Sequence, residues 1–138
     1  MHYRVYDKKD ECWVRENIYL SFNKDLLVAK KSLFNTLKLS LASDRRFILQ
    51  ESIELKDKKK RLIFEGDIVK VEIVNEENKV TTVVTGVVAY YPDHAAFYLF
   101  DYLNSKYYPI TSDIAKYMEV IGNVIENKDL LPEKGSSV

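Results

Sequence analysis

The sequence predicts a mainly β protein with a minor α component, in which a small β-rich lobe precedes an SH3-like small barrel. Three observations favour this fold. Short apolar stretches alternate with polar residues at period two, turn residues separate these stretches at short intervals, and 10 Tyr and 6 Phe enrich the chain in strand-forming residues. We assign residues 1–50 to the N-terminal lobe, 51–131 to the barrel and 132–138 to a flexible tail.

The N-terminal lobe is expected to consist of short strands. Residues 3–6 and 12–14 flank a polar turn and can pair as an antiparallel hairpin. Residues 18–22 place Ile18, Leu20 and Phe22 on one face, as a half-buried strand requires. The apolar-rich residues 47–55 are expected to be extended as well.

Residues 24–41 have two competing interpretations. Leu26, Ala29, Leu33 and Leu37 are spaced by three, four and four residues, which suits an amphipathic helix. The alternation in residues 37–41 and the turn residues before Leu26 instead favour a hairpin. We favour the hairpin, and the spacing alone leaves the helix open.

The barrel is organised around residues 64–74, which predict a tight turn that enters a long strand. Gly66 is the natural residue for a positive φ, and Asp67 can hydrogen-bond neighbouring backbone, so we expect this pair to form a structural turn. In the strand that follows, Val69, Val71 and Ile73 fall on one face.

The rest of the barrel follows from the same pattern. Residues 80–90 are apolar on both faces and therefore predict a central strand, in which Gly86 indicates a bulge or bend. Thr111 or Ser112 can N-cap a short helix that continues through Tyr117. Other strands are expected at residues 62–64, 96–100, 105–110 and 119–125.

Two stretches of the barrel resemble signatures of the YopX family, small proteins of phages and prophages of mostly Gram-positive bacteria. Leu55-Lys56-Asp57-Lys58, followed by Leu62-Ile63-Phe64-Glu65-Gly66-Asp67-Ile68-Val69, is similar to the first signature. Glu119-Val120-Ile121-Gly122-Asn123-Val124-Ile125-Glu126-Asn127, followed by Leu130-Leu131, is similar to the C-terminal one. Residues 3–7 match the family's start more loosely, so the resemblance spans nearly the whole chain.

The sequence departs from the family pattern in two places. Thr-Gly-Leu is common in the family where this chain has Ile53-Glu54-Leu55, and Asn-Gly is common where this chain has Lys59-Lys60. Losing Asn-Gly removes a type I′ turn, so we expect a longer turn or another type here. The resemblance implies an SH3-like barrel after a small β lobe, and it carries no activity with it.

The charges are divided unevenly along the chain, although 21 basic and 21 acidic residues give a formal net charge of zero. Residues 1–70 hold 16 basic and 11 acidic residues, whereas residues 71–138 hold 5 and 10. Such asymmetry can reflect opposite patches that meet within the molecule or between subunits, or a basic patch for nucleic acid. We favour the first explanation because the chain lacks an overall basic excess.

No combination of residues predicts a catalytic, cofactor or metal site. Cys12 is the only cysteine, and we expect it to pack as a small apolar residue beside Trp13. The two histidines are His2 and His94, and we expect His94 to lie at a loop tip. The N-terminus lacks a signal peptide and no apolar stretch is long enough to span a bilayer, so we expect the cytoplasm of a bacterial host and no membrane.

These observations predict a YopX-like phage or prophage protein that is not an enzyme but a protein-interaction or self-assembling module. Its expected partner is itself, as a homo-oligomer, or a host or phage protein. The alternative is a nucleic-acid-binding accessory protein that uses the basic turn at residues 56–61. Candidate contacts to nucleic acid or partner are the basic residues Lys58, Lys59, Lys60 and Arg61 and the tyrosines Tyr90 and Tyr91.

Overall fold

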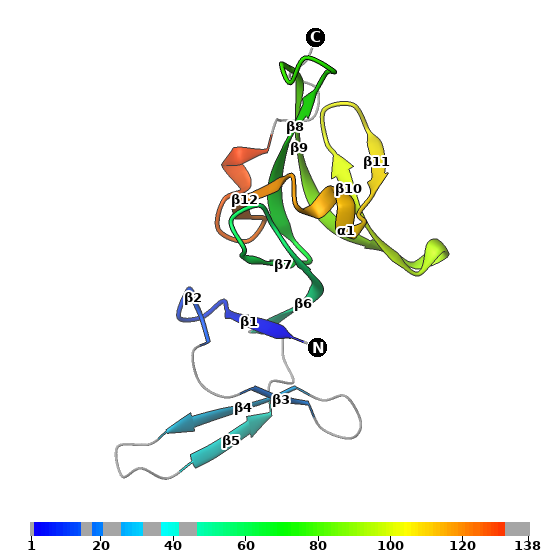
Figure 1. Cartoon of the computed structure of the whole chain (residues 1–138). Helices are drawn as coiled ribbons and strands as arrows, with labels where there is room; N and C mark the ends of the chain where they lie inside the picture. Colours follow the sequence, from blue (N-terminus) through cyan, green and yellow to red (C-terminus); the bar gives the residue numbers. More distant parts are fainter. Residues whose placement is uncertain (1, 15–17, 21–25, 32–36, 42–46, 132–138) are drawn as a thin grey trace. The chain divides into compact units, whose positions relative to one another are not determined.

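The chain folds almost entirely into β-strands that belong to two compact units, His2–Glu51 and Ser52–Val138 (Figure 1). In the part of the chain that is described, twelve strands accompany one short α-helix and two 3-10 turns. The prediction of a mainly β fold with little helix is therefore confirmed. The computed structural model describes residues 2–14, 18–20, 26–31, 37–41 and 47–131, so the predicted tail at residues 132–138 lies outside the described residues.

The first unit contains two groups of antiparallel strands. In one of them, β1 (Tyr3–Asp7) lies between β2 (Cys12–Trp13) and the first half of β6 (Phe47–Lys56). The other group is a three-stranded sheet in the order β3-β4-β5. Its strands are β3 (Ile18–Leu20), β4 (Leu26–Lys31) and β5 (Leu37–Leu41). Since β4 pairs antiparallel with β5, the described residues between 24 and 41 form the hairpin, and the helix alternative is wrong.

Side-chain contacts fix the β1 hairpin locally. Val5 is fully buried, and the Asp7 carboxylate accepts the backbone N–H of Lys9 across the turn at 3.0 Å. The Trp13 ring packs edge-on against the Tyr6 ring, with centroids 5.2 Å apart. The expectation that Cys12 packs beside Trp13 is wrong, because Cys12 is exposed: successive residues of β2 point to opposite faces, and Trp13 takes the packed one.

The second unit is a five-stranded antiparallel sheet that curls into a half-barrel, in the strand order β11-β10-β9-β8-β12. The long pair β8 and β9 runs along its centre (Figure 1), which confirms the predicted central strand. Closure of this half-barrel in the SH3-like manner stays a prediction. The strands of this sheet are β8 (Asp67–Val74), β9 (Val80–Tyr91), β10 (Ala96–Asp101), β11 (Lys106–Pro109) and β12 (Met118–Asn123). A further short strand, β7 (Leu62–Phe64), pairs with the second half of β6.

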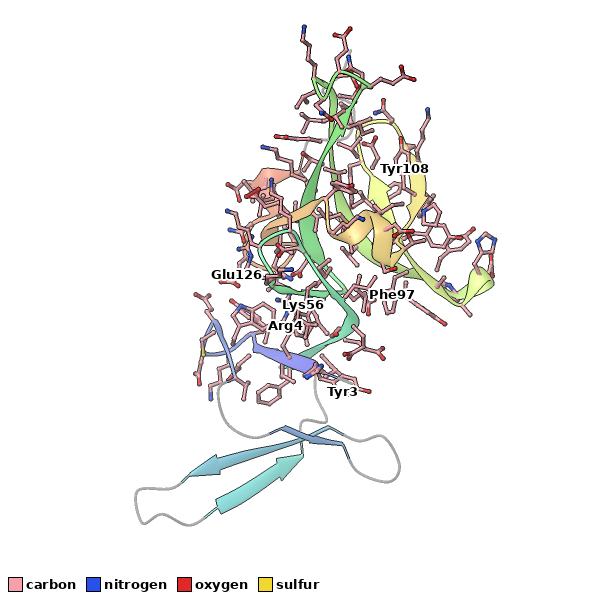
Figure 2. All side chains as sticks on the ribbon, viewed as in Figure 1. Tyr3, Arg4, Lys56, Phe97, Tyr108 and Glu126 are labelled. Atoms are coloured by element: carbon pink, nitrogen blue, oxygen red, sulfur yellow. The ribbon has the colours of Figure 1, made fainter. Side chains whose placement is uncertain are left out.

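The core of the half-barrel lies on one face of this sheet. Its buried members are Ile63, Val69, Val84, Val88, Leu99, Ala115 and Met118. Phe97 of β10 and Tyr108 of β11 are partly buried against them (Figure 2). Helix α1 (Ser112–Ala115) contributes Ala115 and is shorter than predicted, since it ends before Tyr117.

The turn before β8 is built by Gly66 and Asp67. Gly66 has a φ of 88°, a conformation that glycine adopts without steric cost. The buried Asp67 carboxylate accepts the backbone N–H of Phe64 at 2.8 Å and the side-chain amide of Asn123 at 3.2 Å. The Gly66 carbonyl in turn accepts the N–H of Val124 at 2.9 Å, so the turn is linked to the end of β12.

Gly86 has a different role from the predicted bulge or bend. The ladder between β9 and β10 runs through it without a register shift, from Phe100 opposite Val87 to Asp101 opposite Gly86. A Cβ atom on Gly86 would lie 2.4 Å from the carbonyl oxygen of Phe100. The glycine is therefore needed because the neighbouring backbone comes too close for any side chain.

We expect Gly86→Ala to destabilise the protein by about 3 kcal/mol, because a rigid backbone carbonyl must move to admit the methyl group. Gly122→Ala is the matched variant, since its Cβ would meet mainly the movable side chains of Leu130 and Asn127. Urea unfolding of both variants measures the costs. An equal cost at the two positions would contradict the explanation from the Phe100 carbonyl.

Candidate functional site

The basic turn between β6 and β7 is a compact loop closed by backbone hydrogen bonds. The N–H of Asp57 donates to the carbonyl of Arg61 at 2.8 Å, and the N–H of Lys60 donates to the carbonyl of Asp57 at 3.0 Å. Lys60 has a φ of 65°, whereas Lys58 and Lys59 do not adopt positive φ. This geometry matches a three-residue hairpin loop whose last residue is left-handed, and it differs from the type I′ turn of Asn-Gly.

The Asp57 carboxylate joins this loop to strand β12. Its Oδ1 accepts the N–H groups of Lys59 and Arg61 at 2.9 Å each, and its Oδ2 accepts the N–H of Val120 at 3.0 Å. Burial disfavours the charged carboxylate, but these three donors and the Arg61 guanidinium outweigh it and hold the pKa of Asp57 below its usual range. The Arg61 guanidinium also reaches β12, where Nη2 donates to the Val120 carbonyl at 2.6 Å.

The lysines of the basic turn are likewise paired with a carboxylate of β12. The ammonium groups of Lys58 and Lys59 lie 3.0 and 3.2 Å from the Glu119 carboxylate. Hydrogen bonds from Lys58 and Lys59 lower the pKa of Glu119, and the bond to Glu119 raises the pKa of Lys58. Three of the five basic side chains of the described turn at residues 56–61 are thus paired with a carboxylate, those of Lys58, Lys59 and Arg61.

Two residues adopt the left-handed conformation where family members commonly carry glycine. Glu54 has a φ of 58° and Lys60 a φ of 65°. Side chains with a Cβ atom adopt this conformation at a cost of about 1–2 kcal/mol. At both departures from the family pattern this chain therefore adopts a backbone conformation that favours glycine.

The candidate tyrosines Tyr90 and Tyr91 lie on opposite faces of β9. Tyr90 is 45% exposed, and its ring packs edge-on against Phe97. Tyr91 belongs to the outer face, together with Tyr98 and Tyr107 from the neighbouring strands. Since adjacent residues of a strand point to opposite sides, the two tyrosines cannot form one platform.

The outer face of β9, β10 and β11 carries a continuous set of aromatic rings, which we call the aromatic face. Its members are Tyr91, His94, Tyr98, Phe100, Tyr102 and Tyr107. Neighbouring centroids are 4.7 to 6.4 Å apart, and Nδ1 of His94 lies 2.8 Å from the Tyr98 hydroxyl. Tyr107 lies at the centre of the set, because its ring contacts the rings of Tyr91, Tyr98 and Phe100. The Tyr107 residue is 51% exposed.

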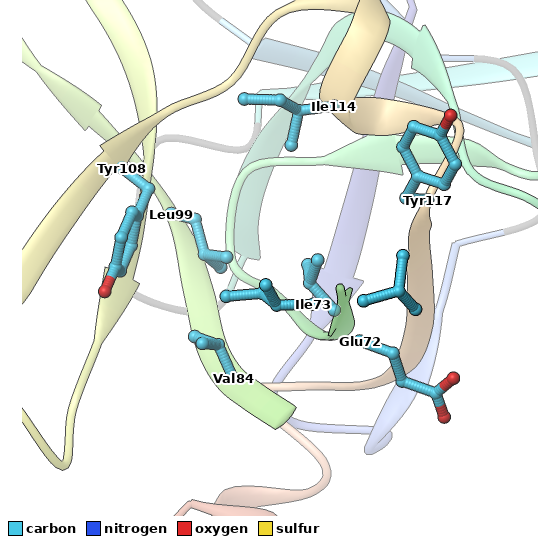
Figure 3. A pocket seen from close by; sticks show the side chains of 9 residues that line it. Glu72, Ile73, Val84, Leu99, Tyr108, Ile114 and Tyr117 are labelled. Carbon is cyan, nitrogen blue, oxygen red and sulfur yellow. The ribbon is translucent and has the colours of Figure 1, made fainter. Parts of the chain in front are cut away.

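The opposite, concave face opens into an apolar cavity of about 300 Å³ (Figure 3). Strand β8 contributes Ile73, and the turn at helix α1 contributes Ile114 and Tyr117 (Figure 3). Ile73 is 44% exposed and Tyr117 61%, so the rim is apolar as well. The remaining lining residues are Val71, Glu72, Val74, Val84, Leu99 and Tyr108.

Period two along β9 to β11 distinguishes the two faces and could have predicted which tyrosines are outward. It could not predict which rings are neighbours, since the strand order brings Tyr91 and Tyr107 together.

His94 is exposed in the 3-10 turn Pro92–His94, which fits its expected place at a loop tip. Among the described residues, no group of three or more His, Cys, Asp or Glu could hold a metal ion, and no helix is long and apolar enough to span a membrane.

We expect Asp57→Asn to destabilise the protein by about 2–3 kcal/mol, because an amide cannot accept the donors of both carboxylate oxygens. An unfolded Asp titrates near pH 3.9. Because folding lowers the pKa of Asp57, its stabilisation is fully present above about pH 5 and is lost as the pH falls through the native pKa. The wild-type advantage in urea unfolding should therefore shrink in acid. Glu76→Gln, at an exposed loop position, is the control.

Lys60→Gly should stabilise the protein by about 0.5–1 kcal/mol, since relief of the left-handed strain exceeds the entropy that glycine adds to the unfolded chain. Lys60→Ala removes the same charge and keeps the Cβ atom, so we expect no such gain from it. Thermal unfolding distinguishes the two. Equal stabilisation by both variants would indicate that the Lys60 charge, and not its backbone, is unfavourable.

Solved structures with the same fold share the architecture of both units. Protein YopX from Bacillus subtilis has a TM-score of 0.65 and 18% identity, over 94% of this chain and 97% of that one. Protein EF1440 from Enterococcus faecalis has a TM-score of 0.54 and 20% identity, over 94% of this chain and 96% of that one. No curated protein matches the sequence.

The family comparison covers the two signatures and both units. The model of the YopX protein family matches residues 2–132, which include the Gly66-Asp67 turn and the C-terminal signature. The resemblance identified from the residues is thereby confirmed. The chain belongs to the YopX family.

Proposed function

We propose that this protein is a non-enzymatic binding module that holds an apolar anchor of a partner protein in the concave cavity of its half-barrel. As the family resemblance implies, it would act for a phage or prophage in the bacterial cytoplasm. The observation that carries the proposal is the open apolar cavity of about 300 Å³ between β8, β10, β11 and α1. Protein interfaces commonly place one aliphatic or aromatic anchor in such a pocket.

The lining of the cavity favours a protein side chain over a small ligand. Small-molecule sites add a few polar groups that orient the ligand within an apolar pocket. Here the described lining is apolar except for Glu72 and the hydroxyl groups of Tyr108 and Tyr117, and the Lys70 ammonium lies 3.6 Å from the Glu72 carboxylate. The exposed rim of Ile73 and Tyr117 extends the apolar area around the cavity, as a docked peptide or helix would require.

Nucleic-acid binding through the basic turn ranks second. Phosphate contact requires basic groups that are available to replace counterions. Lys58, Lys59 and Arg61 already lie against the carboxylates of Glu119 and Asp57. Each of these pairs would have to open before a phosphate could take its place, which reduces the gain from binding.

The non-enzymatic assignment rests on how the buried carboxylates are used. Asp7, Asp57 and Asp101 each accept two backbone N–H groups of their own turns, and Asp67 accepts one. These bonds occupy acceptor positions that a general base would need for a substrate proton. The carboxylates therefore act as turn-forming groups.

Ile73→Lys should abolish partner capture, because it places a charge at the mouth of the apolar cavity. Val83→Lys is the matched control: Val83 is 50% exposed, compared with 44% for Ile73, and belongs to the opposite face of the same strand pair. The measurement is affinity capture from nuclease-treated host lysate with quantitative mass spectrometry. A photo-crosslinking amino acid at Tyr117 identifies whatever contacts the cavity.

A protein that crosslinks at Tyr117 and is lost only from Ile73→Lys supports the proposal. Equal capture by Ile73→Lys and wild type would place binding elsewhere. Crosslinking to a small apolar metabolite would replace the protein partner with a ligand. Retention of nucleic acid before nuclease treatment, lost on charge reversal at Lys58 and Lys59, would favour the basic turn.

A further inference from the structure

The far end of the β8–β9 hairpin has a free edge. On one side of the hairpin, β12 begins at Met118, opposite Val71. On the other side, β10 ends at Asp101, opposite Gly86, so the hairpin extends beyond both neighbouring strands (Figure 1). Along residues 72–74, no described strand accompanies β8 on the side that faces away from β9. A two-stranded ribbon is only marginally stable by itself, so a third strand would stabilise this end of the hairpin.

The backbone groups of Val74 point to this free side. The carbonyl of Ile73 accepts the hydroxyl of Thr81 on β9 at 3.0 Å. The N–H of Asn75 donates to the carbonyl of Lys79 at 2.9 Å. Residues 73 and 75 therefore direct these groups toward β9, and because backbone groups alternate along a strand, Val74 directs its N–H and C=O away from β9. An extended chain on the free side could bind both groups.

The edge of β8 is better suited to pairing than the edge of β9. Ile73 lies opposite Thr82, whereas Val74 lies opposite Val80, so Thr81 is an extra residue on β9. Such a bulge distorts its own strand, and natural sheets use bulges to protect an edge from pairing. The extra residue is not on β8, so the edge of β8 stays regular as far as Val74.

The apolar cavity lies beside the same edge. Ile73 lines it from β8, and Ile114 and Tyr117 line it from the turn at α1 (Figure 3). The backbone of Ile73 faces β9, so a residue of an added strand opposite Ile73 would form a non-hydrogen-bonded pair with it, in which side chains approach most closely. The added side chain would point to the same face as Ile73, and therefore into the cavity.

Acidic residues outnumber basic ones along this end of the hairpin. Residues 70–79 hold the acids Glu72, Glu76 and Glu77 and the bases Lys70 and Lys79. The Lys70 ammonium lies 3.6 Å from the Glu72 carboxylate, and that of Lys79 lies 3.8 Å from the Glu77 carboxylate. Among the described residues, Glu76 has no ion pair. A segment with a basic residue next to its apolar anchor would therefore complement this edge.

We propose that the partner protein binds as an added β-strand along residues 72–74 of β8, with a large apolar side chain in the cavity opposite Ile73 and a Lys or Arg next to it. Backbone hydrogen bonds to Val74 would supply affinity, and the cavity would select the anchor. A helix could not bind these groups, because its own backbone groups are already paired. The inference rests on the proposed function and adds the conformation and chemistry of the docked segment.

A library of random linear peptides, displayed on yeast and selected on the full chain, is the probe. Selected peptides should share a large apolar residue next to Lys or Arg. NMR of a selected peptide bound to isotope-labelled protein should show backbone contacts between the peptide and Val74. The Val74 amide should exchange with solvent rapidly in the free chain and slowly in the complex. These measurements need no variant.

Val74→Pro and Val74→Ala are the matched pair of variants. Proline removes the outward N–H that the added strand needs, and it is tolerated where that N–H faces solvent. Alanine shortens the same side chain and keeps the N–H. We expect Val74→Pro to weaken peptide binding about tenfold or more and Val74→Ala by less than about threefold. Circular dichroism spectra like that of the wild type verify that both variants fold.

The outcomes separate this inference from the cavity proposal. A bound peptide that is helical, or that Val74→Pro binds as tightly as wild type, overturns the added strand. If Ile73→Lys still abolishes its binding, the cavity proposal stands. A selection without any peptide that Ile73→Lys fails to bind overturns both. A Val74 amide that is protected from exchange in the free chain contradicts the free edge, and self-association that Val74→Pro abolishes would assign the edge to a second copy in place of a partner.

Discussion

The half-barrel depends on two buried carboxylates that link turns to strand β12. Asp57 accepts the N–H of Val120, 63 residues further along the chain, and Asp67 accepts the side-chain amide of Asn123, 56 residues further along. Each carboxylate also holds its own turn through backbone N–H groups, so no charge is buried without donors. Strand β12 is an edge of the sheet, and these bonds fix it against the loops that precede β7 and β8.

The same bonds change the meaning of the basic turn. As a sequence, residues 56–61 are a run of five basic residues and one acid, which favours a solvated hairpin turn and leaves phosphate contact as the alternative. In the fold, the single acid, Asp57, is buried and holds the loop together through its hydrogen bonds. Glu119 of β12 forms ion pairs with Lys58 and Lys59. Three of the five basic groups of this turn are therefore already paired, which weakens the case for phosphate binding there.

A single curled sheet gives the protein two different surfaces. On the concave side, side chains do not fill the space beside Ile73 and Tyr117, and an apolar cavity remains there. On the outer side, rings from three strands contact one another around Tyr107. Alternation along each strand separates the two surfaces, so a change on one face leaves the other intact.

The sequence by itself determined the strands, the central position of residues 80–90, the Gly66-Asp67 turn and the family, because period-two alternation and turn chemistry are local properties. Only the tertiary structure decided the roles of Asp57, Gly86 and Tyr91. Asp57 accepts the N–H of Val120 on β12, Gly86 lies against the carbonyl of Phe100 on the next strand, and the Tyr91 ring contacts rings on β10 and β11. These partners are distant in sequence, and strand order, which local patterns do not encode, brings them together.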